Sequence, residues 1–416
     1  MWEKIKAKSY KFLRWSEKYT KTDMVYLARG GFWLSFGQVI SSGSTFILAI
    51  AFANLLPKEI YGQYKYILSI VAILGIATLG GMDLSIMKAV ANGHDGTVRP
   101  ALKTKVRWAL LSGLGSLAVA AYYYLQGNHN LSLGFLIIAC FLPFMDPFFI
   151  YNAVLQGKKN FRTSSIYNMV GKIISIAIII LVIWLSDNLY LLLLAYFASW
   201  TFLRLFYLRQ TLKKSIQNSS VDPDAINYGK HLSVINIIGV VATYIDQLLI
   251  FHFLGATRLA VYAMAIAAPE QIKGAIKNLG TLAFPKFATN DQNSTKKNIR
   301  GKTIKLALAI LAITILYIIL APWLFSIFLP RYMESVLYSQ IFAISLLTGL
   351  TIIPATFLES IGAKKYLYIY STWSSIIQII MLIILVPMFG LMGAVIARVL
   401  SRFINMLQAF WYMKKA

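Results

Sequence analysis

The sequence predicts an all-α polytopic membrane protein with twelve transmembrane helices in two lobes of six. The first observation behind this prediction is composition: 58% of the 416 residues are hydrophobic and 13% are charged, with a mean hydropathy of +0.66. Soluble domains are about half apolar and about 25% charged, so this chain falls in the membrane class. The other two observations are the lengths of the apolar runs and the distribution of basic residues among the loops.

Residues 1–30 precede the first apolar run and mix basic with aromatic side chains, for example Lys4, Lys8, Trp2 and Phe12. This mixture is typical of an amphipathic helix on the cytoplasmic membrane face. The stretch has no short apolar core followed by small residues, so it does not resemble a signal peptide. A nucleic-acid-binding arm is also basic and aromatic, but direct attachment to a membrane domain favours lipid. We therefore expect membrane lipids and no nucleic acid as partners.

Twelve apolar runs follow, each long enough to cross a hydrocarbon core that needs about 20 helical residues. Very short connections at 126–130 and 186–188 predict tight helical hairpins. The runs form a first lobe at 31–210 and a second lobe at 231–416, joined by a polar cytoplasmic loop at 211–230. The predicted spans are 31–53, 66–89, 106–126, 131–154, 166–186, 189–210, 231–254, 259–284, 303–328, 335–358, 366–387 and 390–413.

Basic residues are distributed unequally between the two sets of loops. The arm, the loops after every second span and the C-terminus carry most of the lysines and arginines, and the formal net charge is +25. The opposite loops carry Lys58, Lys65, Arg258 and Arg331. Because cytoplasmic loops are enriched in Lys and Arg, both termini are expected to face the cytoplasm, and anionic lipid accounts for the positive charge.

A weak internal repeat supports the two lobes. Residues 52–64 after the first span and 251–262 after the seventh share Phe, Leu and aliphatic positions at an offset of 199 residues, and Ala195 and Ala394 match at the same offset. Two parallel six-helix repeats are an arrangement found in transporters, where substrate binds at the repeat interface and rocking of the lobes gives alternating access.

Three stretches then resemble a known family. They are residues 246–263, with Asp246-Gln247, Leu254-Gly255 and Val261-Tyr262-Ala263, residues 55–64, and residues 79–83. The pattern resembles the lipid-linked oligosaccharide flippases of O-antigen and capsule type, the polysaccharide-biosynthesis branch of the multidrug/oligosaccharidyl-lipid/polysaccharide exporter superfamily.

The resemblance implies a non-enzymatic function. The cargo would be an undecaprenyl-diphosphate-linked oligosaccharide, flipped from the inner to the outer leaflet of a prokaryotic cytoplasmic membrane for export to cell-surface polysaccharide. The polysaccharide polymerase and glycosyltransferases of the same pathway would be partners. Such a cargo needs a wet cavity in which cations meet phosphate oxygens.

Intramembrane cations are the candidates for the diphosphate. Glu270, Lys273 and Lys277 share one helical face, which is either a phosphate-binding stripe or a self-neutralised Glu270–Lys273 pair with Lys277 reaching the inner surface. Arg398 and Arg402 share another face, and Arg398 either binds cargo or pairs with an acid.

Polar faces on other spans are weaker candidates. Lys172 lies in a polar stripe and is as compatible with snorkelling as with a cavity role, and Gln38 belongs to a polar face suited to sugar hydroxyls. The similar face of Ser371, Ser374 and Gln378 is also what ordinary helix packing uses, and packing is the favoured interpretation there.

Buried acids are candidates for coupling or gating, because carboxylates at membrane depth are costly and usually functional. They are Asp83, Asp146, Asp246 and Glu270. Asp146 lies between two prolines, where a broken helix frees carbonyls for a cation, although Asp83 and Asp146 are also placed to pair with inner-leaflet cations such as Lys88. Asp246 is either a coupling residue or one partner of an interhelical salt bridge.

No cofactor is expected beyond a coupling cation, H⁺ or Na⁺, because the sequence has no phosphate-binding Gly-rich loop and no metal-ligand spacing. Two alternatives remain. A cation-coupled multidrug exporter of the same superfamily would need a cavity dominated by acids. A membrane-embedded glycan polymerase or ligase would need a large extracytoplasmic loop, and the outer loops here are short.

Overall fold

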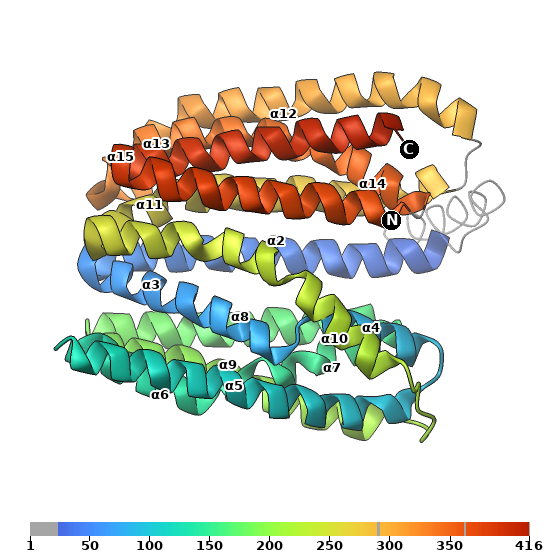
Figure 1. Ribbon diagram of the computed structural model, residues 1–416, viewed down its shortest axis with the longest axis horizontal. Helices are drawn as coiled ribbons and strands as arrows, with labels where there is room; N and C mark the ends of the chain where they lie inside the picture. The colour runs from blue at the N-terminus through green and yellow to red at the C-terminus, as the bar shows by residue number, and fades with distance from the viewer. Residues whose placement is uncertain (1–23, 289–291, 362, 416) are drawn as a thin grey trace, which may run out of the picture.

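The computed structural model describes residues 24–288, 292–361 and 363–415, and every regular element in these ranges is a helix (Figure 1). The predicted arm at 1–30 therefore lies mostly outside the described residues. Ten helical segments in the described part are long and apolar enough to cross a membrane. The chain is an all-α, multi-pass membrane protein, as the composition predicts.

The helices of the first half follow the predicted spans, with breaks inside two of them. The span expected at 66–89 begins earlier, at Lys58, after Pro57, and is interrupted by a 3-10 turn. The span expected at 131–154 breaks at Asp146–Pro147. The elements are α2 (Met24–Leu55), α3 (Lys58–Leu74), η1 (Gly75–Thr78), α4 (Gly81–Ala91), η2 (Asp95–Thr97), α5 (Val98–Leu125), α6 (His129–Met145), η3 (Pro147–Phe149), α7 (Ile150–Gly157), α8 (Phe161–Leu185) and α9 (Leu189–Ser215).

The second half continues with longer elements. The predicted span at 335–358 is divided by a 3-10 segment that the sequence pattern does not predict. The elements are α10 (Ala225–Ile235), α11 (Ile237–Ala288), α12 (Gln292–Phe328), η4 (Pro330–Tyr332), α13 (Ser335–Ala343), η5 (Ile344–Thr351), α14 (Ile352–Ser360) and α15 (Lys364–Lys415).

Two glycines turn the longest elements back on themselves. α11 and α15 each consist of two helices joined at one non-helical residue, Gly255 (φ 83°, ψ 176°) in α11 and Gly390 (φ 58°, ψ −136°) in α15. Residues with a Cβ rarely adopt these backbone angles. A single glycine thus replaces the short polar break that the sequence predicts near residue 255.

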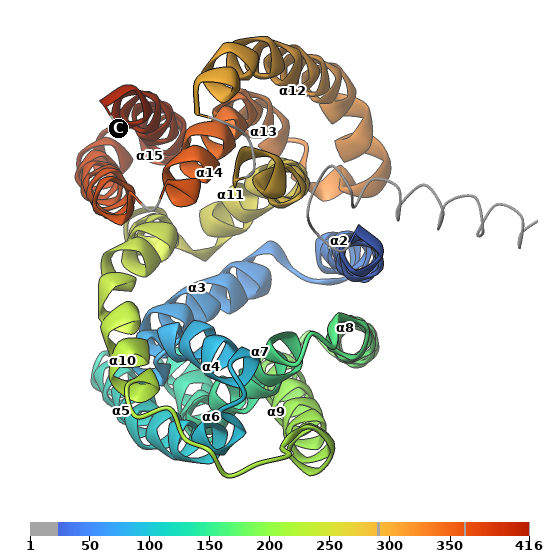
Figure 2. The ribbon, with the colours of Figure 1, turned by 90° about the vertical axis from the view of Figure 1, so that its right-hand side faces the viewer.

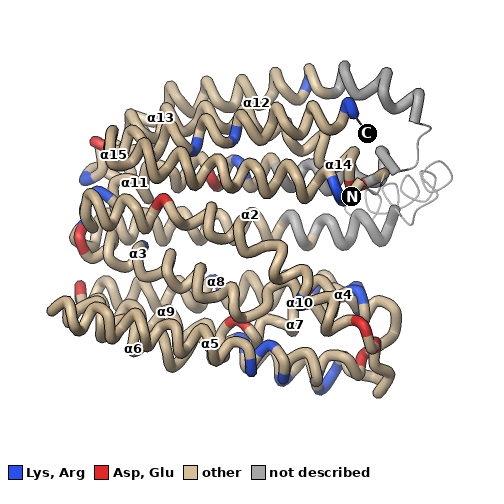
Figure 3. Tube along the Cα trace, in the orientation of Figure 1, with Lys and Arg blue, Asp and Glu red and all other residues tan. Residues whose placement is uncertain are grey.

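The helices lie roughly parallel along the longest axis (Figure 1). α4–α9 gather on one side of the molecule and α12–α15 on the other, as Figure 2 shows end-on. We call the end of the molecule at which α11 and α15 bend the distal end. Charged residues are sparse along the middle of the helices (Figure 3), as expected of segments that face hydrocarbon.

The two halves contact each other closely at the distal end. α3 packs along α11, and a Cβ added to Gly62 would lie 1.9 Å from the carbonyl oxygen of Ala256, so only glycine fits this approach of the two backbones. The rings of Tyr66 and Phe251 stack with centroids 3.8 Å apart. The Asn54 amide donates to the carbonyl of Phe328 over 2.9 Å.

The buried apolar residues also connect the two halves at the distal end and not elsewhere in the described residues. One large cluster lies toward the distal end and contains side chains from both halves, among them Phe52, Phe135, Val261 and Phe342. Away from that end the clusters separate. One belongs to the first half, around Tyr151 with partly buried Ile226, and the other two belong to the second half.

Candidate functional site

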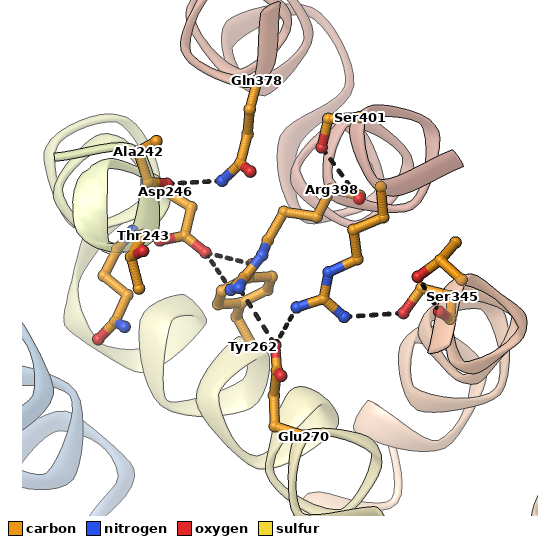
Figure 4. Close-up of polar contacts among 12 residues, drawn as sticks. Ala242, Thr243, Asp246, Tyr262, Glu270, Ser345, Gln378, Arg398 and Ser401 are labelled. Atoms are coloured by element: carbon orange, nitrogen blue, oxygen red, sulfur yellow. Dashed lines mark hydrogen bonds and ion pairs between the residues drawn. The ribbon is translucent and has the colours of Figure 1, made fainter. Parts of the chain in front are cut away.

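An ion cluster lies between α11 and α15, at the level where the two arms of each bent helix face one another (Figure 4). Asp246 lies nine residues before the bend at Gly255, and Arg398 lies eight residues after the bend at Gly390. At 1.5 Å per residue, both are about 12–14 Å from the distal bends. If the bends lie at one edge of a hydrocarbon core about 30 Å thick, the cluster lies near the middle of that core.

Asp246 is the most deeply buried member, with a fully buried side chain. Its Oδ2 accepts hydrogen bonds from Arg398 over 2.8 Å and from the Tyr262 hydroxyl over 2.5 Å. Its Oδ1 accepts from the peptide N–H of Gln247 over 2.8 Å. Asp246 and Tyr262 belong to opposite arms of α11, so the bend at Gly255 brings them together.

Glu270 joins the two arginines through one oxygen. Its Oε1 accepts from Arg398 over 3.1 Å and also from Arg402. Arg402 donates in addition to the Ser345 hydroxyl over 2.9 Å. Both guanidinium groups lie against the ring of Phe342, an arrangement with favourable cation–π energy. Two acids and two arginines make the cluster formally neutral.

This cluster borders a cavity of about 850 Å³, which we call the arginine cavity. Its wall comes from the second half of the chain: α11, η5, α14 and both arms of α15. Besides the cluster it includes two more charged residues, Lys273 and Glu359, and many hydroxyl and amide groups. The polar lining residues are Thr243, Thr348, Thr351, Thr356, Ser371, Ser374, Ser375, Gln378, Ser401 and Asn405.

A second cavity of about 540 Å³, which we call the interface cavity, is lined by both halves, with Asp83 and Asp146 on one side and Ser233 to Tyr244 on the other. Asp83 pairs with Lys105 over 2.5 Å and Asp146 with Arg204 over 2.9 Å. Thr243 borders both cavities, so they adjoin at the first arm of α11.

The structure thus brings five of the predicted site residues to one cavity: Asp246 beneath its wall, and Glu270, Lys273, Arg398 and Arg402 along it. Arg398 and Asp246 form the interhelical salt bridge that was one of the two alternatives for each. The Glu270 carboxylate is bonded to both arginines, a set of partners that was not predicted from the sequence. The cavity lies within the second half, whereas the repeat predicted substrate between the halves.

The other predicted residues lie elsewhere. Lys172 donates to the Ser41 hydroxyl over 2.8 Å between α8 and α2, and Gln38 is exposed and bonded to Ser42. Neither lines either of the two cavities. Asp83 has Lys105 as its partner and not Lys88. Lys277 belongs to α11, but its side chain lies outside the described residues.

Several site residues were missed from the sequence. Ser371, Ser374 and Gln378 line the arginine cavity, although helix packing was the favoured interpretation. The sequence places Tyr262 in a motif but does not predict it as a partner of Asp246. The signal for this contact is a polar aromatic residue that follows a glycine within an apolar run. Lys105 and Arg204 were not predicted as site residues either, yet both side chains are largely buried against acids.

Solved transporters have this fold. The lipid II flippase MurJ, in an inward closed conformation, superposes with a TM-score of 0.72 at 14% identity, covering 93% of this chain and 87% of that chain. An outward-facing MATE multidrug resistance transporter of the MOP superfamily superposes with a TM-score of 0.62 at 13% identity, covering 93% and 95%. This chain therefore has the fold of these two membrane transporters.

The sequence comparison narrows this class. The profile of the family "Polysaccharide biosynthesis protein" matches residues 27–290, and the chain belongs to that family. The putative O-antigen transporter of Shigella flexneri is a distant relative, 20% identical over 401 residues that cover 89% of this chain and 94% of the relative. The resemblance drawn from residues 55–64, 79–83 and 246–263 is confirmed at the level of the family.

Proposed function

We propose that this protein flips an undecaprenyl-diphosphate-linked oligosaccharide from the inner to the outer leaflet of a prokaryotic cytoplasmic membrane, by alternating access. The observation that carries the proposal is the pair Arg398 and Arg402, held at mid-membrane depth beside a polar cavity of about 850 Å³. Guanidinium groups bind phosphate oxygens with directed, charge-assisted hydrogen bonds. Hydroxyl and amide groups along the rest of the wall suit a hydrated glycan.

The proposed topology has twelve crossings with both termini in the cytoplasm. If each arm of the two bent segments is one crossing, the ten apolar segments become twelve. The distal end would then be extracytoplasmic, in agreement with the bias of basic residues toward the other loops. The two lobes would be 31–210 and 231–416, and membrane lipids, polymerase and glycosyltransferases would be the surrounding partners.

Closure at the distal end supports alternating access. There a single apolar cluster joins the halves, whereas separate clusters occur away from it. Glu334 adds ion pairs to Lys58 from the first half and to Arg258 from the second. Parting of these contacts would open the cavities to the extracytoplasmic side, with rocking of the lobes as in other repeat transporters.

Coupling to a cation, H⁺ or Na⁺, is proposed for the interface cavity. Asp83 and Asp146 each use one carboxylate oxygen in an ion pair, and their side chains remain 30% and 35% exposed. They are the acids a cation would reach there, in contrast to the buried Asp246. Acidic residues within transmembrane segments mark ion pathways in transporters.

The charge of the arginine cavity disfavours the alternative of a cation-coupled drug exporter. Its lining carries three cations, Lys273, Arg398 and Arg402, against the acids Glu270 and Glu359. With Asp246 behind the wall, the site balances three cations against three acids, whereas a cation-coupled drug exporter would need a cavity dominated by acids. A glycan polymerase or ligase is disfavoured because the distant relative from Shigella flexneri is a putative O-antigen transporter.

The test is reconstitution of the full chain in liposomes with a fluorescent probe: a polyprenyl diphosphate bearing one dye-labelled N-acetylhexosamine. A membrane-impermeant quencher reports how fast the probe reaches the outer leaflet. We expect Arg402→Ala to lower the flipping rate at least about tenfold, because one lost charge-assisted contact is worth 1.5–3 kcal/mol or about 10–100-fold. Lys277→Ala is expected to act in the same direction.

Arg209→Ala is the matched control, because Arg209 is exposed on α9 and lines neither cavity. It removes the same charge and should leave the rate unchanged. Unaltered flipping in both Arg402→Ala and Lys277→Ala, with correctly inserted protein, would remove the proposal. Transport of a lipophilic cation in place of the probe would establish the exporter instead.

A further inference from the structure

Resting on the proposed function, we infer that the arginine cavity recognises the glycan through the acceptor oxygens of its serines and threonines, so that the sugar hydroxyls bound there act as hydrogen-bond donors. The recognised class is a sugar with free hydroxyl groups. A sugar of the same size whose substituents can only accept hydrogen bonds would bind more weakly.

Most hydroxyl groups that line the cavity share one feature, which is that their hydrogens are already in use. Each donates to a backbone carbonyl three or four residues earlier in the chain, over 2.6–3.0 Å. The lining residues with this contact are Thr243, Thr348, Thr351, Thr356, Ser375 and Ser401.

The direction of these hydrogen bonds follows from their chemistry. A carbonyl oxygen has no hydrogen, so the hydroxyl is the donor in each pair. A hydroxyl group has one hydrogen and two acceptor lone pairs. These residues therefore offer a ligand acceptor capacity, and they can donate to it only by giving up their backbone partner.

The acceptors are distributed around the cavity and do not follow a single helix. Thr243 lies on the first arm of α11, Thr351 on η5 and Thr356 on α14. Ser375 and Ser401 lie on the two arms of α15. Since a sugar ring has hydroxyls around its edge, acceptors on several sides of the cavity can each take one of its hydrogens.

The strongest donors of the cavity are its cations. The guanidinium groups of Arg398 and Arg402 can only donate hydrogen bonds, which suits phosphate oxygens that only accept. Gln378 and Asn405 also line the cavity, but their amides both donate and accept and so do not discriminate. The cavity thus combines a donor part for the diphosphate with an acceptor part for the sugar.

The experiment compares the binding of two probes to the full chain in detergent by calorimetry. Both are farnesyl diphosphates that carry one N-acetylhexosamine, and in the second probe fluorine replaces every free sugar hydroxyl. Fluorine is close to a hydroxyl in size but cannot donate a hydrogen bond, and both probes present the same diphosphate to the arginines. We expect the fluorinated probe to bind at least about tenfold more weakly, which corresponds to about two net hydrogen bonds.

Thr243→Val and Thr356→Val, alone and combined, remove acceptors with little change of shape. The combined variant should bind the hydroxylated probe about threefold to tenfold more weakly and the fluorinated probe as before. The ratio of the two dissociation constants therefore narrows, whereas a loss of packing alone would weaken both probes equally. Thr243→Ser retains the hydroxyl and should retain the ratio.

Thr314→Val is the matched control. The Thr314 hydroxyl on α12 donates to the carbonyl of Ile310 over 2.8 Å, which is the same contact with the fourth residue back that Thr243 and Thr356 make. Thr314 lines neither the arginine cavity nor the interface cavity. Its replacement should leave both affinities unchanged.

The outcomes separate this inference from the proposed function. Equal affinity of the unmutated protein for the two probes would overturn the inference and leave the proposed function standing. The inference also fails if the ratio does not narrow in the combined variant, or if Thr314→Val narrows it as much. Absence of binding of both probes and of farnesyl diphosphate itself would instead remove the proposed function.

Discussion

The buried pair Asp246–Arg398 allows a structural and a functional role to be separated. Asp246 is fully buried, Arg398 is 10% exposed at its side chain, and their atoms are 2.8 Å apart. The perturbation is Asp246→Asn, which keeps the shape but removes the charge. Arg398 would then keep Glu270 as its charged partner, at 3.1 Å.

The expected cost is large because the partner left behind is buried. Removing one member of a buried ion pair typically costs about 3–5 kcal/mol, and Asp246 also accepts hydrogen bonds from Tyr262 and from a peptide N–H. We therefore expect Asp246→Asn to lower the free energy of unfolding by about 3 kcal/mol or more. The exposed Glu334, whose partners Lys58 and Arg258 are also accessible, provides the contrast. Glu334→Gln should cost less than about 1 kcal/mol.

The assay is denaturant-induced unfolding in mixed micelles, followed by tryptophan fluorescence for each variant. A double replacement, Asp246→Leu with Arg398→Met, removes both charges and should recover much of the lost stability, because apolar replacements of whole buried pairs are often neutral. The same double variant should lose probe flipping, since the arginine cavity then keeps one arginine.

Two results would refute this reasoning. If Asp246→Asn costs no more than Glu334→Gln, the buried pair is not structurally important. If the double variant is stable and flips the probe at the original rate, the salt bridge has no functional role beyond stability.

The remaining predictions concern the backbone. Gly62→Ala should destabilise by about 1–3 kcal/mol, because its Cβ would meet the carbonyl of Ala256 and force α3 from α11; Gly43→Ala, with open space around it, is the control in the same unfolding assay. Gly255→Ala should cost about 1–3 kcal/mol because its backbone angles are nearly exclusive to glycine. Gly274→Ala on the same helix should cost nothing, and equal effects of the two would contradict the strain argument.

Much of the architecture follows from the sequence because a hydrocarbon core allows few backbone structures. Apolar runs near the length of the hydrocarbon core must form helices, and short connections such as 186–188 force their neighbours into hairpins. The candidate charges were also visible, since Glu270, Arg398 and Arg402 are conspicuous in apolar runs. Helical periodicity placed Arg398 and Arg402 on one face.

Breaks inside helices were less predictable. Prolines predicted the break at Asp146, but the 3-10 segment at 344–351 contains no proline. Its course is set by packing against α12 and α15, which a single sequence does not encode in any local pattern. The same reason explains why Ser345, which binds Arg402 from that segment, was not anticipated.

The sequence by itself determined the class, the helices and which charges lie at membrane depth, because burial of a charge in hydrocarbon is unfavourable wherever the helix lies. The tertiary structure alone decided which charges meet. Asp246 and Arg398 are 152 residues apart, and Glu270 and Arg402 are 132 residues apart. Such pairings depend on how bent helices rotate and approach in three dimensions, where a shift of one residue turns a side chain by about 100°.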